Sequence, residues 1–445
     1  MKKIITITAL LAFATITIAE AQTTMTLQEA MRYAVENSTS VSIQELTNKN
    51  THQDKIYAVA SLFPSLSASS SLYNSYGRSI DPETNTYTTI GNVSNSYSLS
   101  TSLTVFSGLT KINSVKAARI GEQSGEYSLQ QIKDATALSV MQLYFDVIYY
   151  GQSVDLMREQ KEASEKVLTL TRRQAELGIK SEADVALSAA QVASYDLLLT
   201  QQQNLYTQTQ LDLKEAMNFP FDDQLSLAEE PTMIIHASNS EFLIEANPEY
   251  QVAKSQLMES EVNLKIARGG YYPTFGLGAG YNNYYYTSMA DGYVATSFTK
   301  QLQTNYGYYL YASLSIPIFN KLYTRTSVTR SRNNLRSAQL QLYKTELSIN
   351  KSAREAILQR DNSFKEHISA EAKVEANELA YTAMLRRFEQ GVSSIIDLQT
   401  SANDLLQAKA EELRSRLNYQ IKCRLVDYYS GKQLISSEKQ LLPYF

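Results

Sequence analysis

Residues 173–185 read RQAELGIKSEADV, and residues 386–398 read RRFEQGVSSIIDL. The two stretches share an arginine, a glutamate, a glycine, a serine and an aspartate, in the same order and at the same spacing. Gly178 corresponds to Gly391, which is an offset of 213 residues (391 − 178). A motif that recurs at so long an interval predicts that the chain is built from two copies of one unit.

Each stretch has the composition of a turn between two helices. The glycine fits the position just after a helix, where a left-handed backbone favours glycine. An S-x-x-D sequence follows, and it predicts a capping box at the start of the next helix. The two sequences are Ser181 to Asp184 and Ser394 to Asp397. The motif therefore predicts two helical hairpin tips, whose aspartates have either a purely structural role or an additional functional one.

The same offset of 213 residues relates Phe106 to Phe319 and Asn218 to Gly431. Each unit is expected to contain an opening helix, two strands, a long helix and a return helix. In the first repeat, 22–218, we expect strands at about 64–78 and 95–106, a long helix at 109–177 and a return helix at 181–217. In the second repeat, 246–431, we expect strands at about 273–287 and 304–318, a long helix at 320–390 and a return helix at 394–430. Residues 219–245 and 432–445 are expected to form a connector and a tail midway along the molecule.

The four strand segments alternate apolar and polar residues. Between residues 96 and 105, for example, Tyr97, Leu99 and Leu103 alternate with serines. Alternating strands of about ten residues suit a transmembrane barrel, whereas a soluble sandwich, the alternative, has strands of about five or six. Aromatic residues at both ends of the strands favour the barrel, because they resemble interfacial girdles. They are Tyr73, Tyr76, Tyr97, Tyr284, Tyr285, Tyr286, Tyr306 and Tyr308 at one end, and Phe63, Phe106, Tyr271, Tyr272 and Phe319 at the other. Residues 79–94 and 288–303 are expected to be polar loops.

The segment 109–177 contains no proline, and as one helix it would be roughly 100 Å long. It carries two apolar stripes, which predict a helical neighbour on each side, as in a ring of helices. The alternative is a helix buried in a bundle core. Each return helix covers about half of a long helix, so the opening helices, about 25–62 and 246–268, are expected to cover the other half.

The first 21 residues read as a secretory signal, with Lys2 and Lys3, an apolar stretch over 4–18 and an A-x-A cleavage site ending at Ala21. An N-terminal membrane anchor is the alternative, but the stretch is short and rich in threonine. Beyond it no apolar run is long enough for a spanning helix. Any membrane span in the mature chain would therefore be made of strands.

Composition excludes several classes of function. The formal net charge of −4 over 445 residues gives no reason to expect nucleic acid as a partner. The single cysteine allows no disulfide, and the three histidines are too far apart in sequence to suggest a metal site. The G-x-G-x-G at 276–280 has the period of a strand and no helix follows it, so it does not suggest a dinucleotide loop. We expect no catalytic, cofactor or metal site, and no enzyme.

The order of elements, together with GIKSEADV (178–185) and GVSSIIDL (391–398), resembles the TolC family of bacterial outer-membrane efflux proteins. The resemblance implies an α+β membrane protein and a homotrimer. Each protomer would give four strands to one twelve-stranded outer-membrane β-barrel, and its long coiled-coil helices to a periplasmic α-barrel. The serine and glycine faces of the strands would line a wet lumen that does not bind a solute.

The resemblance also implies a passive exit duct in a tripartite efflux or type I secretion system. Its partners would be a periplasmic adaptor (a membrane fusion protein), an inner-membrane pump of the RND or ABC type, and outer-membrane lipid. Two alternatives remain: a porin-type channel with a periplasmic stalk, and a soluble coiled-coil scaffold. A porin needs only short periplasmic turns, so the long hairpins favour the duct.

By the same resemblance, the hairpin tips would form a periplasmic gate. Asp397 matches a residue that forms an acidic ring, Asp184 matches its partner in the first repeat, and Thr400 stands where a second ring residue is expected. Phe388 and Ser393 stand where some relatives have a tyrosine and an arginine that hold the gate. We therefore expect fewer polar links, and a gate that is loose or closed by packing. The expected adaptor contacts are Gly178, Ile179, Lys180, Gly391, Val392 and Ser393.

Overall fold

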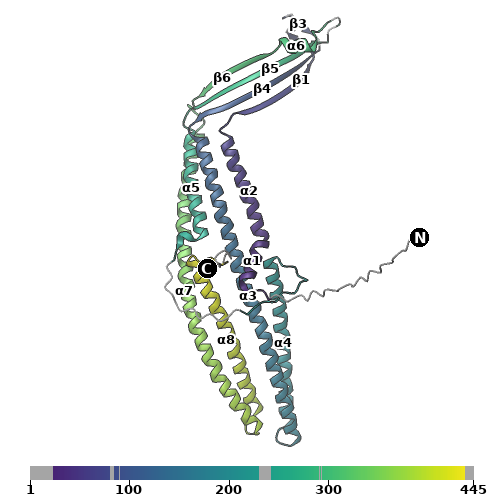
Figure 1. The fold of residues 1–445 in the computed structure, drawn as a ribbon, viewed down its shortest axis with the longest axis vertical. Helices are drawn as coiled ribbons and strands as arrows, with labels where there is room; N and C mark the ends of the chain where they lie inside the picture. The colour runs from purple at the N-terminus through teal and green to yellow at the C-terminus, as the bar shows by residue number, and fades with distance from the viewer. Residues whose placement is uncertain are drawn as a thin grey trace, which may run out of the picture.

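The computed structural model describes residues 24–80, 85–89, 91–229, 242–289, 291 and 293–435. The molecule is elongated, with a β-sheet at one end and long helices that extend from it to two hairpin tips (Figure 1). The expected signal segment lies outside the described residues, as do residues 230–241 of the connector and 436–445 of the tail.

Four antiparallel strands form the sheet, in the order β1-β4-β5-β6 (Figure 1). They are β1 (Ser65–Ser75), β4 (Asn92–Ser107), β5 (Thr274–Ser288) and β6 (Gly307–Ser315). Each repeat therefore contributes one strand pair, and β4 pairs with β5 to join the two repeats. Among the described residues, the outer edges of β1 and β6 have no partner strand.

The register extends the alternation seen in the sequence across the whole sheet. Ser65 lies opposite Ser102, Ser102 opposite Gly278, and Gly278 opposite Tyr311. Residues directly opposite one another share a face, so one face combines the serines of β1 and β4 with the glycines of β5. Tyr309 also lies on this face, opposite Gly280. This face therefore also carries large aromatic side chains, Tyr309 and Tyr311 among them.

The loops at the far end of the sheet contain short elements rather than irregular chain alone. β2 (Arg78–Ile80) pairs with β3 (Tyr87–Thr89), and α6 (Phe298–Thr304) packs against β5. The Gln301 side-chain amide donates to the Tyr286 carbonyl at 2.8 Å, and its oxygen accepts from the Tyr286 N–H at 2.9 Å. Gln301 thus takes the place of a partner strand where β5 extends beyond β6.

Two helices of 67 residues each run the length of the helical part, α3 (Thr110–Glu176) and α7 (Tyr323–Glu389). The return helices α4 (Glu182–Met217) and α8 (Ile395–Tyr429) pack beside their tip-side halves (Figure 1). The helix α5 (Pro248–Gly269) packs against both long helices on the sheet side. None of the described helices combines the length and apolar character needed to cross a membrane.

The opening helix of the first repeat is divided, unlike the single helix expected over 25–62. The structure has α1 (Leu27–Asn37) and α2 (Thr39–Ala60), whereas the second repeat has only the short 3₁₀ turn η1 (Ile244–Ala246) before α5. Ser38 separates α1 from α2 with an extended backbone, and its hydroxyl accepts from the Val41 N–H at 3.3 Å. A serine that caps a new helix interrupts the old one.

Both long helices begin in the same way. Gly108 and Leu109 have left-handed φ angles of +62°, and their counterparts Lys321 and Leu322 have φ angles of +53° and +62°. A Cβ atom at Gly108 would lie 2.4 Å from the carbonyl oxygen of Gly269 at the end of α5, so a larger residue does not fit there. The second repeat keeps the left-handed turn without glycine, which shows that the strand-to-helix geometry is retained despite its conformational cost.

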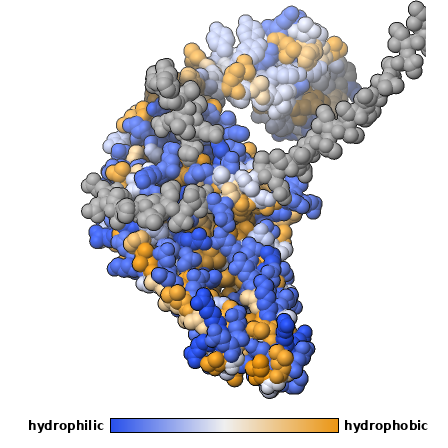
Figure 2. All heavy atoms as spheres, turned by 60° about the horizontal axis from the view of Figure 1, so that its bottom comes forward, coloured by the Kyte–Doolittle hydropathy of each residue, from blue (hydrophilic) through white to orange (hydrophobic). Residues whose placement is uncertain are grey.

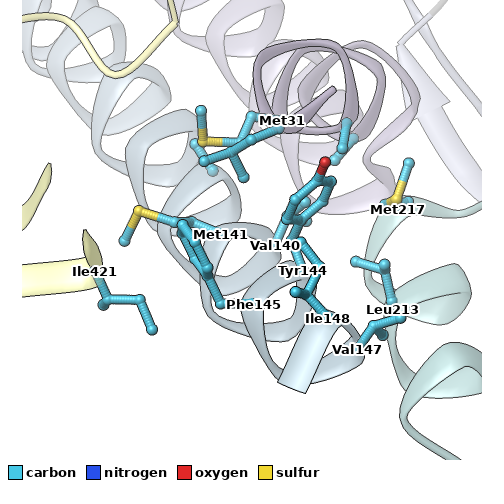
Figure 3. Packing of buried hydrophobic residues seen from close by; sticks show 14 of the residues in the cluster. Met31, Val140, Met141, Tyr144, Phe145, Val147, Ile148, Leu213, Met217 and Ile421 are labelled. Carbon is cyan, nitrogen blue, oxygen red and sulfur yellow. The ribbon is translucent and has the colours of Figure 1, made fainter. Parts of the chain in front are cut away.

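The largest core lies midway along the molecule, where α1, α3, α4 and α8 meet (Figure 3). Its central residue is Tyr144, whose side chain is fully buried. The Tyr144 hydroxyl donates to the carbonyl oxygens of Ala228 at 2.6 Å and Met25 at 3.1 Å. Met25 in turn forms an isolated parallel bridge with Leu227. Tyr144 therefore attaches both the N-terminal segment and the connector to α3.

We predict that Tyr144→Phe lowers the free energy of unfolding by about 1 kcal/mol, because the buried carbonyls lose a hydrogen bond while the packing is kept. The measurement is thermal unfolding of the purified protein in detergent. Tyr57→Phe is the matched control, since Tyr57 is 76% exposed on α2. Equal destabilisation by the two substitutions would contradict the role given to Tyr144.

Candidate functional site: the paired hairpin tips

The two hairpins turn with the same backbone geometry. Each long helix ends at a glycine with a left-handed backbone, with φ of +74° at Gly178 and +75° at Gly391. The residue after each glycine donates its N–H to the carbonyl oxygen five residues back, at 2.9 Å in both hairpins. This is the Schellman pattern of a helix end, so these glycines have a conformational role whatever else the tips do.

The return helices start with related but unequal caps. The Ser181 hydroxyl accepts from the Asp184 N–H at 3.2 Å, and the Asp184 carboxylate accepts from the Ser181 N–H at 2.9 Å. The Ser394 hydroxyl accepts from the Asp397 N–H at 3.1 Å, but the Asp397 carboxylate accepts from the same hydroxyl, at 2.7 Å. Only the first repeat has the reciprocal capping box. The expectation of two equal boxes was therefore wrong.

The two aspartates consequently differ in environment. The bonds from the backbone and hydroxyl of Ser181 hold the pKa of Asp184 below its usual range, and the nearby Lys180 contributes in the same direction. Asp397 is exposed at the start of α8. Thr400, one turn further on, is also exposed, and its hydroxyl donates to the Ile396 carbonyl of its own helix at 2.9 Å.

A cluster of apolar side chains fills the space between the two hairpin tips. Phe388 is fully buried and lies in a cluster with Ile395 and Leu398. Val167 and Leu170 of α3 pack against this cluster, so it joins the two hairpins of one chain. Phe388 therefore contributes apolar contact where the resemblance placed a polar gate residue.

Polar contacts from the first hairpin reach the second one around this cluster. The Lys180 ammonium donates to the Ser393 carbonyl at 2.7 Å and lies 4.8 Å from the centre of the Phe388 ring. The Gln174 side-chain amide lies 3.3 Å from the carbonyl oxygens of both Phe388 and Glu389. Ser393 itself is 7% exposed and contributes its backbone, so in this arrangement its side chain is covered.

A second set of contacts joins the return helices above the tips. The Tyr195 hydroxyl donates to the Asn403 side-chain oxygen at 2.7 Å and accepts from the Gln160 amide at 3.1 Å. The Gln399 amide donates to the Leu187 carbonyl at 3.2 Å. The sequence did not identify Gln174, Tyr195 or Asn403, because each is a single residue within a long helix and its partner on the other hairpin is more than 200 positions away.

The outer surface of the tips carries exposed apolar side chains among charged ones. Figure 2 shows hydrophobic side chains at the tip end of the molecule. The exposed apolar residues there are Leu177, Ile179, Val392 and Ile396, each between 57% and 69% exposed. Large apolar side chains that gather at one end of a molecule and are rimmed by polar residues favour a contact surface. Within the described residues, no group of three or more histidine, cysteine, aspartate or glutamate side chains is placed to hold a metal ion.

We predict that Asp184→Asn destabilises the protein at neutral pH by less than about 1 kcal/mol, and that this difference disappears in acid. The folded pKa of Asp184 lies below its unfolded value of about 3.9. Its contribution is therefore present above that unfolded value and is lost as pH falls through the folded pKa.

The measurement is the melting temperature of both proteins between neutral and acidic pH. Glu182→Gln removes a charge from the same helical turn without removing a bond to Ser181, and it serves as the control. A difference between Asp184→Asn and the unsubstituted protein that persists at the most acidic pH would contradict the assignment.

Comparison with known proteins gives a consistent picture of this architecture. Residues 241–426 match the family model of the outer membrane efflux protein. The search of curated proteins finds no match.

Solved structures match over nearly the whole chain. VceC, an outer membrane protein of Vibrio cholerae, is 14% identical, with a TM-score of 0.79 over 92% of this chain and 96% of its own. The CmeC outer membrane channel of Campylobacter jejuni is 14% identical, with a TM-score of 0.79 over 91% and 85%. The open state of the MtrE outer membrane channel of Neisseria gonorrhoeae is 17% identical, with a TM-score of 0.76 over 92% and 89%. At these identities the matches show a shared fold.

Proposed function

We propose that this chain, whose second half is an outer membrane efflux protein domain and whose fold is that of TolC-like channels, is a passive exit duct of the outer membrane. It would conduct solutes from an adaptor and an inner-membrane pump, in a tripartite efflux or type I secretion system. One observation carries this proposal: a sheet with one apolar and one polar face stands at one end of two helices that are each roughly 100 Å long.

The apolar face of the sheet supports placement in a membrane. Leu66, Leu310 and Leu314 lie on it and are 72%, 84% and 64% exposed. None of the four strands contains a charged residue. Lipid would cover the apolar face, and the serine and glycine face would line the lumen.

The open edges of β1 and β6 support association with further copies. In lipid each unpaired backbone group costs several kcal/mol, so β6 of one copy would pair with β1 of the next. A homotrimer, as the family resemblance implies, would close a twelve-stranded barrel. Because α2 leads into β1 and α7 follows β6, α2 of one copy would then lie beside α7 of its neighbour.

The exposed faces of these two helices fit such a contact. Large apolar side chains at steps of three and four residues lie exposed on each, and this spacing forms a helix-packing seam. They are Ile43 and Leu46 on α2, and Leu340, Tyr343 and Leu347 on α7, between 52% and 60% exposed. Their apolar area would be covered by the neighbouring copy.

We predict that the chain is found in the outer membrane as a trimer that heating dissociates to the monomer, and that Leu347→Glu reduces the trimer. A charge buried in the seam would be unpaired. Migration of unheated and heated membrane fractions on a denaturing gel is the measurement. Gln341→Glu, exposed elsewhere on α7, is the control.

Other outcomes separate the alternatives. A monomer recovered from the periplasm would support a soluble scaffold and contradict the duct. A trimer that co-purifies with no periplasmic adaptor would support a porin-type channel.

The adaptor contacts that we propose are the exposed tip residues Ile179 and Val392, with the backbone at Gly178, Lys180, Gly391 and Ser393.

We also propose that the tips form the periplasmic gate and that Asp397 contributes an acidic ring. Asp397 and Asp404 are both exposed on α8 and are seven residues apart, so they lie on one stripe of the helix. Asp184 would help to shape the tip through its cap, while Phe388, Ser393 and Lys180 would hold the two hairpins together. Thr400 lies between the two aspartates and adds no charge.

We predict that Asp397→Asn weakens block of the channel by divalent cations by about fivefold, since a charge pair about 4 Å apart in water is worth about 1 kcal/mol. Single-channel recordings in planar bilayers are the measurement. Asp155→Asn makes the same charge change roughly 30 Å from the tip along α3, and should leave block unchanged. Unaltered cation selectivity and block in Asp397→Asn would remove Asp397 from the gate.

A further inference from the structure

Two tyrosine rings lie flat across the glycines on the serine-glycine face of the sheet. Gly278 lies opposite Tyr311, and Gly280 opposite Tyr309. A Cβ atom on Gly278 would come within 2.3 Å of the Tyr311 ring, and one on Gly280 within 2.5 Å of the Tyr309 ring. The rings therefore occupy the space that side chains of β5 would fill, and their outer surfaces remain open.

The two rings form one continuous surface. Their centroids are 6.1 Å apart and their planes differ by 27°. Tyr309 and Tyr311 are 48% and 47% exposed, as expected for rings with one face covered by a strand and the other open. We call this pair the tyrosine floor. Aromatic side chains that cover glycine on a neighbouring strand stabilise a sheet, so a purely structural role has to be distinguished by experiment.

The surroundings of the tyrosine floor offer a solute no charged side chain as a partner. None of the four strands contains a charged residue. On the same face, the serine hydroxyls of β1 and β4 bond to one another in pairs, which reduces the hydrogen-bonding groups open to a sugar. The pairs are Ser65 with Ser102 at 3.0 Å, Ser67 with Ser100 at 2.9 Å, and Ser69 with Ser98 at 2.6 Å. Stacking on the two rings is then the contact that distinguishes this part of the wall.

We propose that the tyrosine floor is a stacking site for planar aromatic solutes on the wall of the conduit. This inference rests on the proposed function, which makes the serine-glycine face the lumen. A flat ring binds face to face on a tyrosine pair, and a positive charge on the ring strengthens the contact. The site favours aromatic cargo over aliphatic cargo of the same charge.

The test measures block of the reconstituted full-length channel by three probes: proflavine, tetraethylammonium and maltotriose. Proflavine is a planar aromatic cation, tetraethylammonium an aliphatic cation and maltotriose a neutral sugar. We expect proflavine to block with the longest residence time. In the double variant Tyr309→Leu/Tyr311→Leu, that residence time falls about tenfold, the size of effect that aromatic contacts of this kind give.

Glycine variants test the geometry with both tyrosines retained. Gly278→Ala forces the Tyr311 ring off the strand and is expected to shorten proflavine block. Gly276→Ala is the matched control, because its nearest neighbour is the Ser313 hydroxyl at 3.2 Å and no ring lies over it. Tyr308→Leu, on the opposite face of β6, controls for loss of a tyrosine. Both controls are expected to keep wild-type block.

Three results would overturn the proposal: equal block by tetraethylammonium, stronger block by maltotriose, or unchanged proflavine block in the double tyrosine variant. In each case the channel still conducts, and the proposed duct stands. Recovery of the unsubstituted protein as a monomer from the periplasm would instead overturn the duct and this inference together.

Discussion

The backbone groups along the outer edges of β1 and β6 impose the main constraint on this molecule. Four strands cannot close a barrel, and within the described residues neither edge has a strand partner. Where β5 extends beyond β6, the chain resolves the same problem locally, because Gln301 bonds to both backbone groups of Tyr286. Among the described residues, the outer edge of β6 itself has no such substitute. The proposed association with other copies would also account for Leu340 and Leu347, which lie exposed on a helix outside the sheet.

The two repeats share their backbone and differ in their side chains, and the difference is greatest at the tips. Lys180 and Ser393 are equivalent positions, since 393 − 180 is 213, and they contact each other across the hairpin pair. Likewise Phe388 is the fully buried residue of the tip cluster, while its equivalent in the first repeat is Ala175. Duplication supplied two superimposable hairpins, and divergence gave one of them the lysine and the other the phenylalanine. The contact of Lys180 with the second hairpin therefore depends on a difference between the two repeats of one chain.

Local patterns predicted the elements well and their mutual contacts poorly. Strand period, helix length and the glycine and serine signals at 178–184 and 391–397 depend on neighbouring residues, so the sequence reveals them. The resemblance in fold to TolC-like proteins, which rested on these patterns, is confirmed by the comparisons with known proteins. The stretch YGYYLY at 306–311 places tyrosines on both faces, and only the register with β5 shows that Tyr309 and Tyr311 cover glycines. Tyr195 and Asn403 carry no local signal either, because their contact depends on how two separate hairpins pack.

The tip contacts also indicate how firmly the proposed gate is held. The hydrogen bonds between the hairpins are few, and each is worth about 0.5–1.5 kcal/mol. Burial of the Phe388 side chain in the cluster that Val167 and Leu170 cover adds about 1.5–3 kcal/mol. Separating the hairpins would expose that ring and break the contacts of Lys180 and Gln174, at a total cost of several kcal/mol per copy. A partner that binds the exposed apolar tips in the separated arrangement could supply energy of that size, whereas thermal fluctuation would open all copies together only rarely. Packing of Phe388 together with the hydrogen bonds of Lys180 and Gln174 to backbone carbonyls, rather than a network of charge pairs, would then set the resistance of the gate.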